Sequence, residues 1–144
     1  MGPHQCAAAI APLLRYAIGQ WKTRGVWNDR VVHCFMGCVA ARLCGPDMVW
    51  EMSQRWEAFE WYYMFPIQVC LGRRKFLPFT WFRNTGLDHY NTVVIGGMQC
   101  GVAGFLKYPG LTQGCGDCCE DADKNGDLLK PPGPVTPPSI FYAQ

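Results

Sequence analysis

The stretch Asn28–Gly45, NDRVVHCFMGCVAARLCG, carries the clearest structural signals in this chain of 144 residues. Asn28 or Asp29 can cap the start of a helix, because a short side-chain oxygen accepts a hydrogen bond from a backbone N–H of the first turn. Gly45 can adopt the left-handed conformation that commonly ends a helix. The stretch therefore predicts a helix that ends at Cys44 and carries one histidine and three cysteines.

Two pairs of cysteines have helical spacing. Cys34 and Cys38 are four residues apart in this stretch, and Cys115 and Cys119 are four apart in a later segment. Residues four apart share one helix face, so each pair can face the other. This geometry suits two parallel disulfides or, as a lesser alternative, a zinc site with four thiolates. Cys118 follows Cys115 at the spacing common in zinc and redox sites, and unbonded buried thiols would suit a reducing compartment.

The composition narrows the class of protein. Nine cysteines favour an oxidising compartment or a metal site, and the odd number leaves at least one thiol unpaired. Cys34 and Cys44 also match half of the twin Cys-x9-Cys pattern of mitochondrial intermembrane-space proteins, which keeps a mitochondrial location as an alternative. The net charge of +2 is too small to indicate a nucleic-acid partner. No stretch reaches the roughly eighteen uncharged apolar residues of a membrane span, so membrane contact is not favoured.

Apolar spacing and helix-boundary residues predict four further helices. They cover Gln5–Lys22, Pro46 to about Tyr63, Asp88–Leu106 and about Gln113–Lys124. Prolines and glycines interrupt Phe65–Gly86, which predicts a long aromatic loop. The chain is therefore predicted to be all-α, with a single compact domain of four or five helices at 1–130, cross-linked by cysteines, and a proline-rich tail at 131–144.

Polar residues on three of the predicted helices could meet in one pocket. They are His33, Glu57, Asp88 and Asn91. Taken alone, His33 would more often be a satisfied core residue, Glu57 would face water and Asp88 would cap a helix. Together they would suit hydrolysis, with a histidine or carboxylate activating water and the asparagine amide holding substrate.

The segment DADKNGDL matches the first half of an EF-hand calcium loop, with oxygen-bearing side chains at alternate positions and Gly126 at the sharp turn. The candidate calcium ligands are Asp121, Asp123, Asn125 and Asp127. Pro132 occupies the position of the usual bidentate glutamate, so a tight site would need another carboxylate. We favour a polar helix that ends at an Asn-Gly cap.

The order of these motifs resembles a helical domain at the C-terminal tips of Rhs and wall-associated polymorphic toxins. That family has an Asn-Asp pair before an Arg-His-Cys-x3-Cys helix, then His-Glu, then Asp-x-x-Asn leading to Val-Gly, and finally a Cys-x3-Cys helix. The resemblance covers about Val26–Leu128 and matches Asn28, Asp29, His33, Cys34, Cys38, Gly45, Glu57, Asp88, Asn91, Gly96, Cys115, Cys119 and Gly126. It departs at Val32 and Trp56, which replace the family's arginine and the histidine of its His-Glu pair.

The resemblance implies a secreted, toxin-like effector domain with a cognate immunity protein as partner, and it implies no particular reaction. If the residues replaced by Val32 and Trp56 are catalytic, the activity is lost or altered. The alternative is a non-enzymatic structural or interaction subunit of a larger assembly, membrane-associated or mitochondrial, that docks through the aromatic loop Phe76–Phe82 and the tail. A small calcium- or disulfide-stabilised binding module is a third interpretation.

Overall fold

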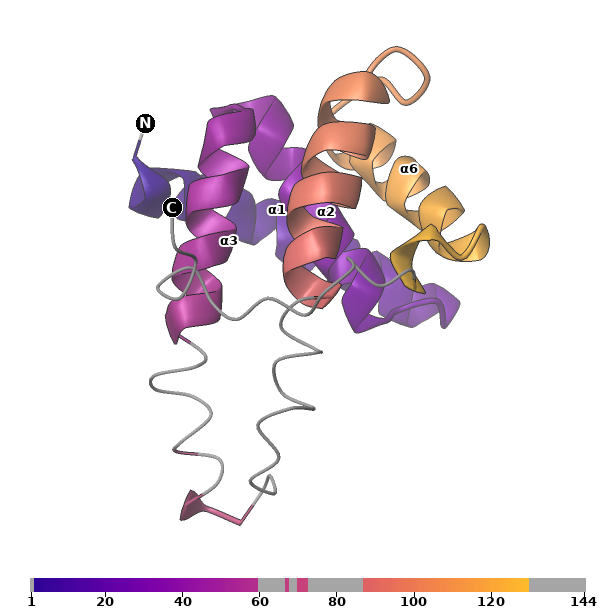
Figure 1. Ribbon diagram of the computed structural model, residues 1–144. Coiled ribbons are helices and arrows are strands. Elements are labelled where there is room, and N and C mark those ends of the chain that lie inside the picture. The colour runs from indigo at the N-terminus through magenta and orange to yellow at the C-terminus, as the bar shows by residue number, and fades with distance from the viewer. Residues whose placement is uncertain (1, 60–66, 68–69, 73–86, 130–144) are drawn as a thin grey trace.

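The computed structural model describes residues 2–59, 67, 70–72 and 87–129, with the backbone alone at 57–59. Its elements are α1 (Pro3–Arg24), α2 (Asp29–Cys44), α3 (Pro46–Phe59), the π-helix η2 (Asn91–Ala103), α6 (Thr112–Lys124) and the 3₁₀ turn η3 (Asp127–Leu129). The predicted all-α class is confirmed (Figure 1). Most of the predicted aromatic loop and the tail 131–144 lie outside the described residues, so the division at residue 130 stays a prediction.

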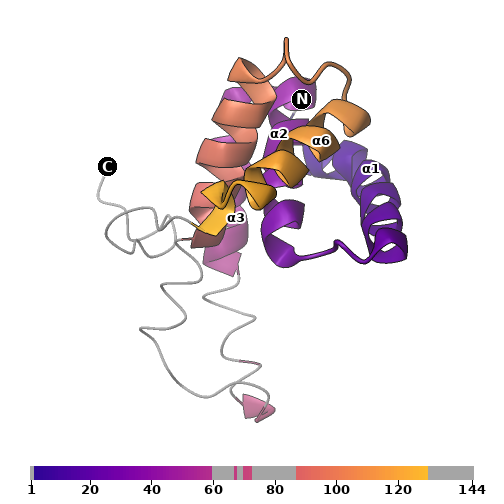
Figure 2. The same cartoon turned by 90° about the vertical axis from the view of Figure 1, so that its right-hand side faces the viewer.

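Helix α2 is the centre of the fold and contacts every other helix named above. Helices α1 and η2 lie on opposite sides of it, and α3 and α6 lie on the two remaining sides (Figures 1 and 2). Its buried residues therefore surround the helix axis, unlike those of a surface helix with one apolar stripe. They are Val31, Cys34, Phe35, Gly37, Cys38, Val39, Ala40 and Ala41.

The ends of α2 agree with the predicted boundaries. The Asn28 side chain accepts a hydrogen bond from the Val31 backbone N–H at 2.9 Å. At the other end, Gly45 has a φ of 99° and its N–H donates to the Ala41 carbonyl. A side chain at this positive φ would be strained, so glycine is required where α2 turns sharply into α3.

Two parallel disulfides join α2 to α6, as the spacing predicts. Cys34 bonds to Cys119 and Cys38 to Cys115, with Cα–Cα distances of 5.8 and 5.6 Å. Because the lower-numbered cysteine of α2 pairs with the higher-numbered cysteine of α6, the two helices run antiparallel. Each disulfide stabilises a fold by about 2–4 kcal/mol, mainly by restricting the unfolded chain.

Two further disulfides were not predicted individually. Cys6–Cys44 joins the start of α1 to the end of α2, and Cys100–Cys118 joins η2 to α6. Cys70, the remaining cysteine, is an exposed free thiol, which agrees with the odd count. The four disulfides indicate an oxidising compartment. Within the described part of the chain, no helix is long and apolar enough to cross a membrane.

The helix predicted from Asp88 differs from the α-helix expected, because Asn91–Ala103 has π-helical hydrogen bonding. Glycines let its backbone touch that of α2. A Cβ atom added to Gly37 would lie 1.8 Å from the Thr92 carbonyl oxygen, and one added to Gly96 would lie 2.1 Å from the Cys34 carbonyl oxygen. Apolar spacing cannot distinguish π from α hydrogen bonding, and so the sequence predicted only a helix with close backbone contacts.

Arg42 binds the end of η2 to α2. Its guanidinium donates to the carbonyls of Cys100 at 2.8 Å and Tyr108 at 2.6 Å, and also to those of Gly101 and Gly110. Carbonyls at a helix C-terminus lack partners within the helix, so one side chain satisfies several of them here. Charge complementarity to the negative end of the helix adds to this contact.

We expect Gly37→Ala to lower the free energy of unfolding by about 3 kcal/mol, because the added methyl would overlap the rigid Thr92 carbonyl. The matched control is Gly19→Ala, since an added Cβ at this exposed helical position has no atom within 4 Å. The control should be neutral or stabilising by about 0.5–1 kcal/mol. Chemical denaturation of the oxidised proteins measures both values. Equal stabilities for the two variants would contradict the close α2–η2 contact.

Candidate functional site

His33 and Asp88 form a polar pair between α2 and the residues that precede η2. The His33 Nε2 atom lies 3.7 Å from Asp88 Oδ2, and Nδ1 lies 2.7 Å from the Asp29 carbonyl oxygen. A carbonyl can only accept a hydrogen bond, so Nδ1 carries the proton in the neutral ring. The lone pair of a neutral imidazole is then on Nε2, the nitrogen that faces the carboxyl group.

The surroundings of Asp88 raise its pKa above the ordinary value of an aspartate. Burial raises the pKa of Asp88, the nearby His33 lowers it, and Asp29 raises it further. The 3.7 Å separation is slightly longer than a hydrogen bond. Catalytic hydrogen bonds in ligand-free proteins are often long and shorten when substrate binds. The pair can therefore hold one proton and pass it to or from a reacting group.

Asn91 follows Asp88 by one helical turn, as the first residue of η2, and is completely buried. Neither its Oδ1 nor its Nδ2 makes a hydrogen bond within the described part of the molecule. A buried amide without partners costs about 1–3 kcal/mol. A bound ligand or water that supplied a partner would recover this energy. The fourth predicted site residue, Glu57, lies on α3, and its side chain is outside the described residues.

A cavity of about 370 Å³ opens beside His33. Helices α1, α2, α3 and η2 all contribute to its walls, which are mainly aliphatic. The lining residues are Pro3, His4, Ala7, Ile10, Ala11, Leu14, His33, Met36, Ala40, Val49, Met52, Ser53, Arg55, Trp56 and Thr92. This cavity was not predicted from the sequence. The apolar spacing of α1 indicates one buried face, but the space between helices depends on how they cross.

A second polar pair lies next to the cavity. Ser53 Oγ on α3 lies 3.0 Å from His89 Nδ1, and both side chains are buried. The indole of Trp50 packs edge-on against the imidazole at 5.0 Å. Burial lowers the pKa of His89 to about 4. His89 is therefore neutral at physiological pH and is a weak base.

The predicted calcium ligands are distributed around a helix. Asp121 and Asp123 belong to α6, and residues two apart on an α-helix point about 200° away from each other. Asp121 accepts a hydrogen bond from the Tyr108 hydroxyl at 2.7 Å. Asn125 is the C-cap residue of α6, and Gly126 follows with a φ of 78°. The segment has the geometry of the interpretation favoured from the sequence, a polar helix with an Asn-Gly stop. Calcium binding there stays a prediction. Asp127 belongs to the following turn, η3.

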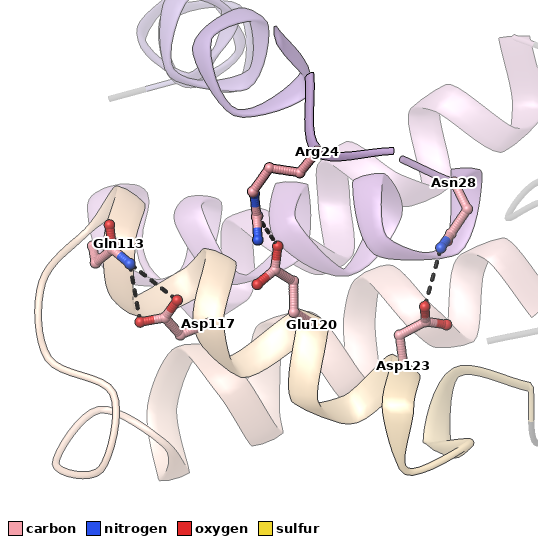
Figure 3. Close-up of polar contacts among 6 residues, drawn as sticks. All are labelled: Arg24, Asn28, Gln113, Asp117, Glu120 and Asp123. Carbon is pink, nitrogen blue, oxygen red and sulfur yellow. Dashed lines mark hydrogen bonds and ion pairs between the residues drawn. The ribbon is translucent and has the colours of Figure 1, made fainter. Parts of the chain in front are cut away.

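The acidic side of α6 instead binds the connection between α1 and α2. Asp123 accepts a hydrogen bond from Asn28 Nδ2 at 3.0 Å and pairs with Arg30 Nε at 3.4 Å, while Glu120 pairs with Arg24. Figure 3 shows the contacts of Asn28 and Arg24. Asn28 therefore caps α2 with one amide atom and holds α6 with the other.

The predicted zinc alternative is replaced by disulfide bonding. Among the described residues, one group of three potential metal ligands has its ligand atoms within 4.8 Å of one another. It consists of the sulfurs of Cys34, Cys100 and Cys119. Each of these sulfurs belongs to a disulfide. Zinc is bound by the thiolate, so the oxidised protein does not offer these ligands.

We expect His89 to make the fold sensitive to acid. Between pH 6.5 and about 4 the unfolded chain binds a proton at His89 that the folded protein does not, so stability falls as the pH falls. The loss should reach about 3 kcal/mol near pH 4. Denaturation of wild type and His89→Gln at pH 7 and pH 4.5 tests this, with exposed His4→Gln as control. An unchanged acid sensitivity in His89→Gln would contradict the assignment.

Comparison of the chain with protein-family models, with curated proteins and with solved structures finds no match. The function is therefore inferred from the His33–Asp88 pair and the cavity.

Proposed function

We propose that this chain is a toxin-like effector domain, secreted or delivered into an oxidising compartment, that hydrolyses its substrate with His33 as the general base. The observation that carries the proposal is the position of His33. His33 lines the 370 Å³ cavity, and its Nε2 atom faces the Asp88 carboxyl group at 3.7 Å. The base is thus placed beside a space that can hold a substrate.

In the proposed reaction, the Asp29 carbonyl holds Nδ1–H and so leaves the lone pair of Nε2 available to accept a proton. Nε2 accepts a proton from water as the water oxygen attacks the substrate. The Asp88 carboxylate stabilises the imidazolium that forms, and Nε2 then returns the proton to the leaving group. Asn91, which was predicted to hold the substrate, is completely buried and is not among the residues that line the cavity.

The alternative base, His89, is less suited to this role. A general base accepts a proton during the reaction. General-base catalysis is most efficient when the pKa of the base lies near the working pH. The pKa of His89 is lowered to about 4 by burial. The hydrogen bond between His89 and Ser53 is therefore assigned a structural role, and Ser53 is not the proposed nucleophile.

The effector context rests on the resemblance to Rhs and wall-associated toxin domains and agrees with four disulfides in a small helical fold. The departure at Trp56 lies in the site itself, because this side chain lines the cavity. An indole cannot transfer protons as the family's histidine would, which leaves His33 and Asp88 to do so. A cognate immunity protein is the proposed partner, and delivery to the mitochondrial intermembrane space is the alternative location.

A second candidate function, a non-enzymatic interaction subunit, is favoured by exposed apolar side chains at the end of η2. Met98, Val102 and Phe105 are each about half exposed, and Leu106 is 92% exposed. Contiguous exposed apolar surface often marks a protein interface. The aromatic loop and the tail, which were predicted to dock, lie outside the described residues.

We expect His33→Gln to reduce hydrolysis of the small ester p-nitrophenyl acetate by roughly 10²–10⁴-fold, because it removes the general base. Asp88→Asn should lower the rate as well, while Arg15→Gln, at an exposed position of α1 outside the cavity lining, serves as the control. The rates are measured on oxidised proteins whose folding is verified by circular dichroism.

Two outcomes would contradict the proposed site. Wild-type protein without activity above the buffer rate would favour the interaction subunit. Activity lost in Ser53→Ala but retained in His33→Gln would assign catalysis to the Ser53–His89 pair.

A further inference from the structure

The side chains that line the cavity favour an aliphatic ligand. Helix α1 contributes one continuous face, in which Ala7, Ala11 and Leu14 have helical spacing, and small side chains there leave the space open. Alkyl groups from α2 and α3 also line the cavity, and Trp56 is the only residue with a phenyl or indole ring among the lining residues that the structure describes. A flexible chain of methylenes fits such a surface better than a flat ring, which gains most from aromatic partners. The volume of about 370 Å³ lies within the range of ligand pockets, roughly 300–1,000 Å³.

The ionisable groups that line the cavity favour an anionic ligand. His4, His33 and Arg55 line the cavity, and among the side chains that the structure describes no carboxylate belongs to the lining. The Arg55 guanidinium is largely exposed and pairs with Glu51 at 2.9 Å within the same helix. Exposed pairs of this kind contribute little to stability, so an anionic group at the mouth can compete for Arg55. The lining therefore combines an aliphatic interior with basic groups.

We propose that the cavity binds the aliphatic chain of an anionic amphiphile, with the chain against α1 and α3 and the acidic head group near Arg55 and His4. The substrate class rests on the proposed function and follows from the position of His33 in the lining of the same cavity. It is an acyl ester whose chain fills the cavity and whose carbonyl carbon lies near Nε2.

The corresponding reaction is ester hydrolysis. Water adds through its oxygen to the acyl carbon as His33 Nε2 takes one of its protons. The bond between the acyl carbon and the alkoxy oxygen then breaks, and the alkoxide leaves with the proton from Nε2. The products are one carboxylic acid and one alcohol, so no oxidant or further reactant is needed. The acid product has the same chemical class as the proposed ligand.

The binding test uses octanoate, decanoate and dodecanoate below their micellar concentrations, titrated into the full oxidised chain by calorimetry. Each buried methylene should strengthen binding about fourfold, until the cavity is full. Ala7→Trp places an indole in the cavity and should weaken dodecanoate binding roughly tenfold or more. Ala8→Trp is the matched control, because Ala8 is exposed on the same helix but does not line the cavity, and it should bind as wild type does.

Absence of dodecanoate binding to wild type, or equal affinities for the two variants, would overturn the proposal. So would dimerisation of the wild type without fatty-acid binding, if Ala7→Trp but not Ala8→Trp prevented it in sedimentation. That result would assign the cavity face to a second copy of the chain.

Hydrolysis of p-nitrophenyl dodecanoate, compared with the acetate ester, separates this proposal from the proposed function. We expect a higher kcat/KM for the dodecanoate that Ala7→Trp lowers and Ala8→Trp does not. Hydrolysis that depends on His33 but not on chain length would overturn the substrate class alone. Chain-length-dependent binding without hydrolysis would overturn the proposed function and leave the binding site intact.

Discussion

The paired disulfides between α2 and α6 are the constraint on which the rest of this structure depends. Cys34 and Cys38 hold one face of α2 against α6, so the helix cannot rotate about its axis. The next residue around the helix from Cys34 is His33, about 100° away. This offset turns the imidazole away from α6 and toward the cavity beside α1 and α3. Covalent bonds that stabilise the fold therefore also fix the direction of the candidate base.

A central helix contacted on all sides needs close backbone packing, and glycine provides it. At Gly37 and Gly96 the carbonyls of the opposing helix occupy the volume of a side chain. The same contact places Asp88 and Asn91, at the start of η2, next to α2. Burial of these polar groups costs free energy, since Asp88 is partly desolvated and Asn91 lacks partners among the described residues. Such costs are common at functional sites, where a ligand completes the interactions.

Local chemistry explains what the sequence could predict. The Asn28 cap, the Gly45 stop and the four-residue spacing of the cysteines are local features, and the structure confirms the helices and the α2–α6 disulfides built on them. The sequence predicted that His33, Glu57, Asp88 and Asn91 share one pocket, and of these His33 and Asp88 lie 3.7 Å apart. The Cys6–Cys44 and Cys100–Cys118 bonds, the π-helical hydrogen bonding of η2, the Ser53–His89 pair and the cavity were not predicted. All of these depend on how distant helices cross, which residue spacing within one helix does not determine.

The central role of the α2–α6 disulfides is tested most directly by the disulfide map of the oxidised protein. This map is obtained by mass spectrometry of peptides after digestion without reduction. We expect one crosslinked peptide pair that joins Cys34 to Cys119 and another that joins Cys38 to Cys115. We also expect one thiol that can be alkylated, at Cys70. A bond between Cys34 and Cys44, or free thiols at Cys115 and Cys119, would contradict this role. Either result would remove at least one of the two bonds between α2 and α6 and so weaken the constraint that directs His33 toward the cavity.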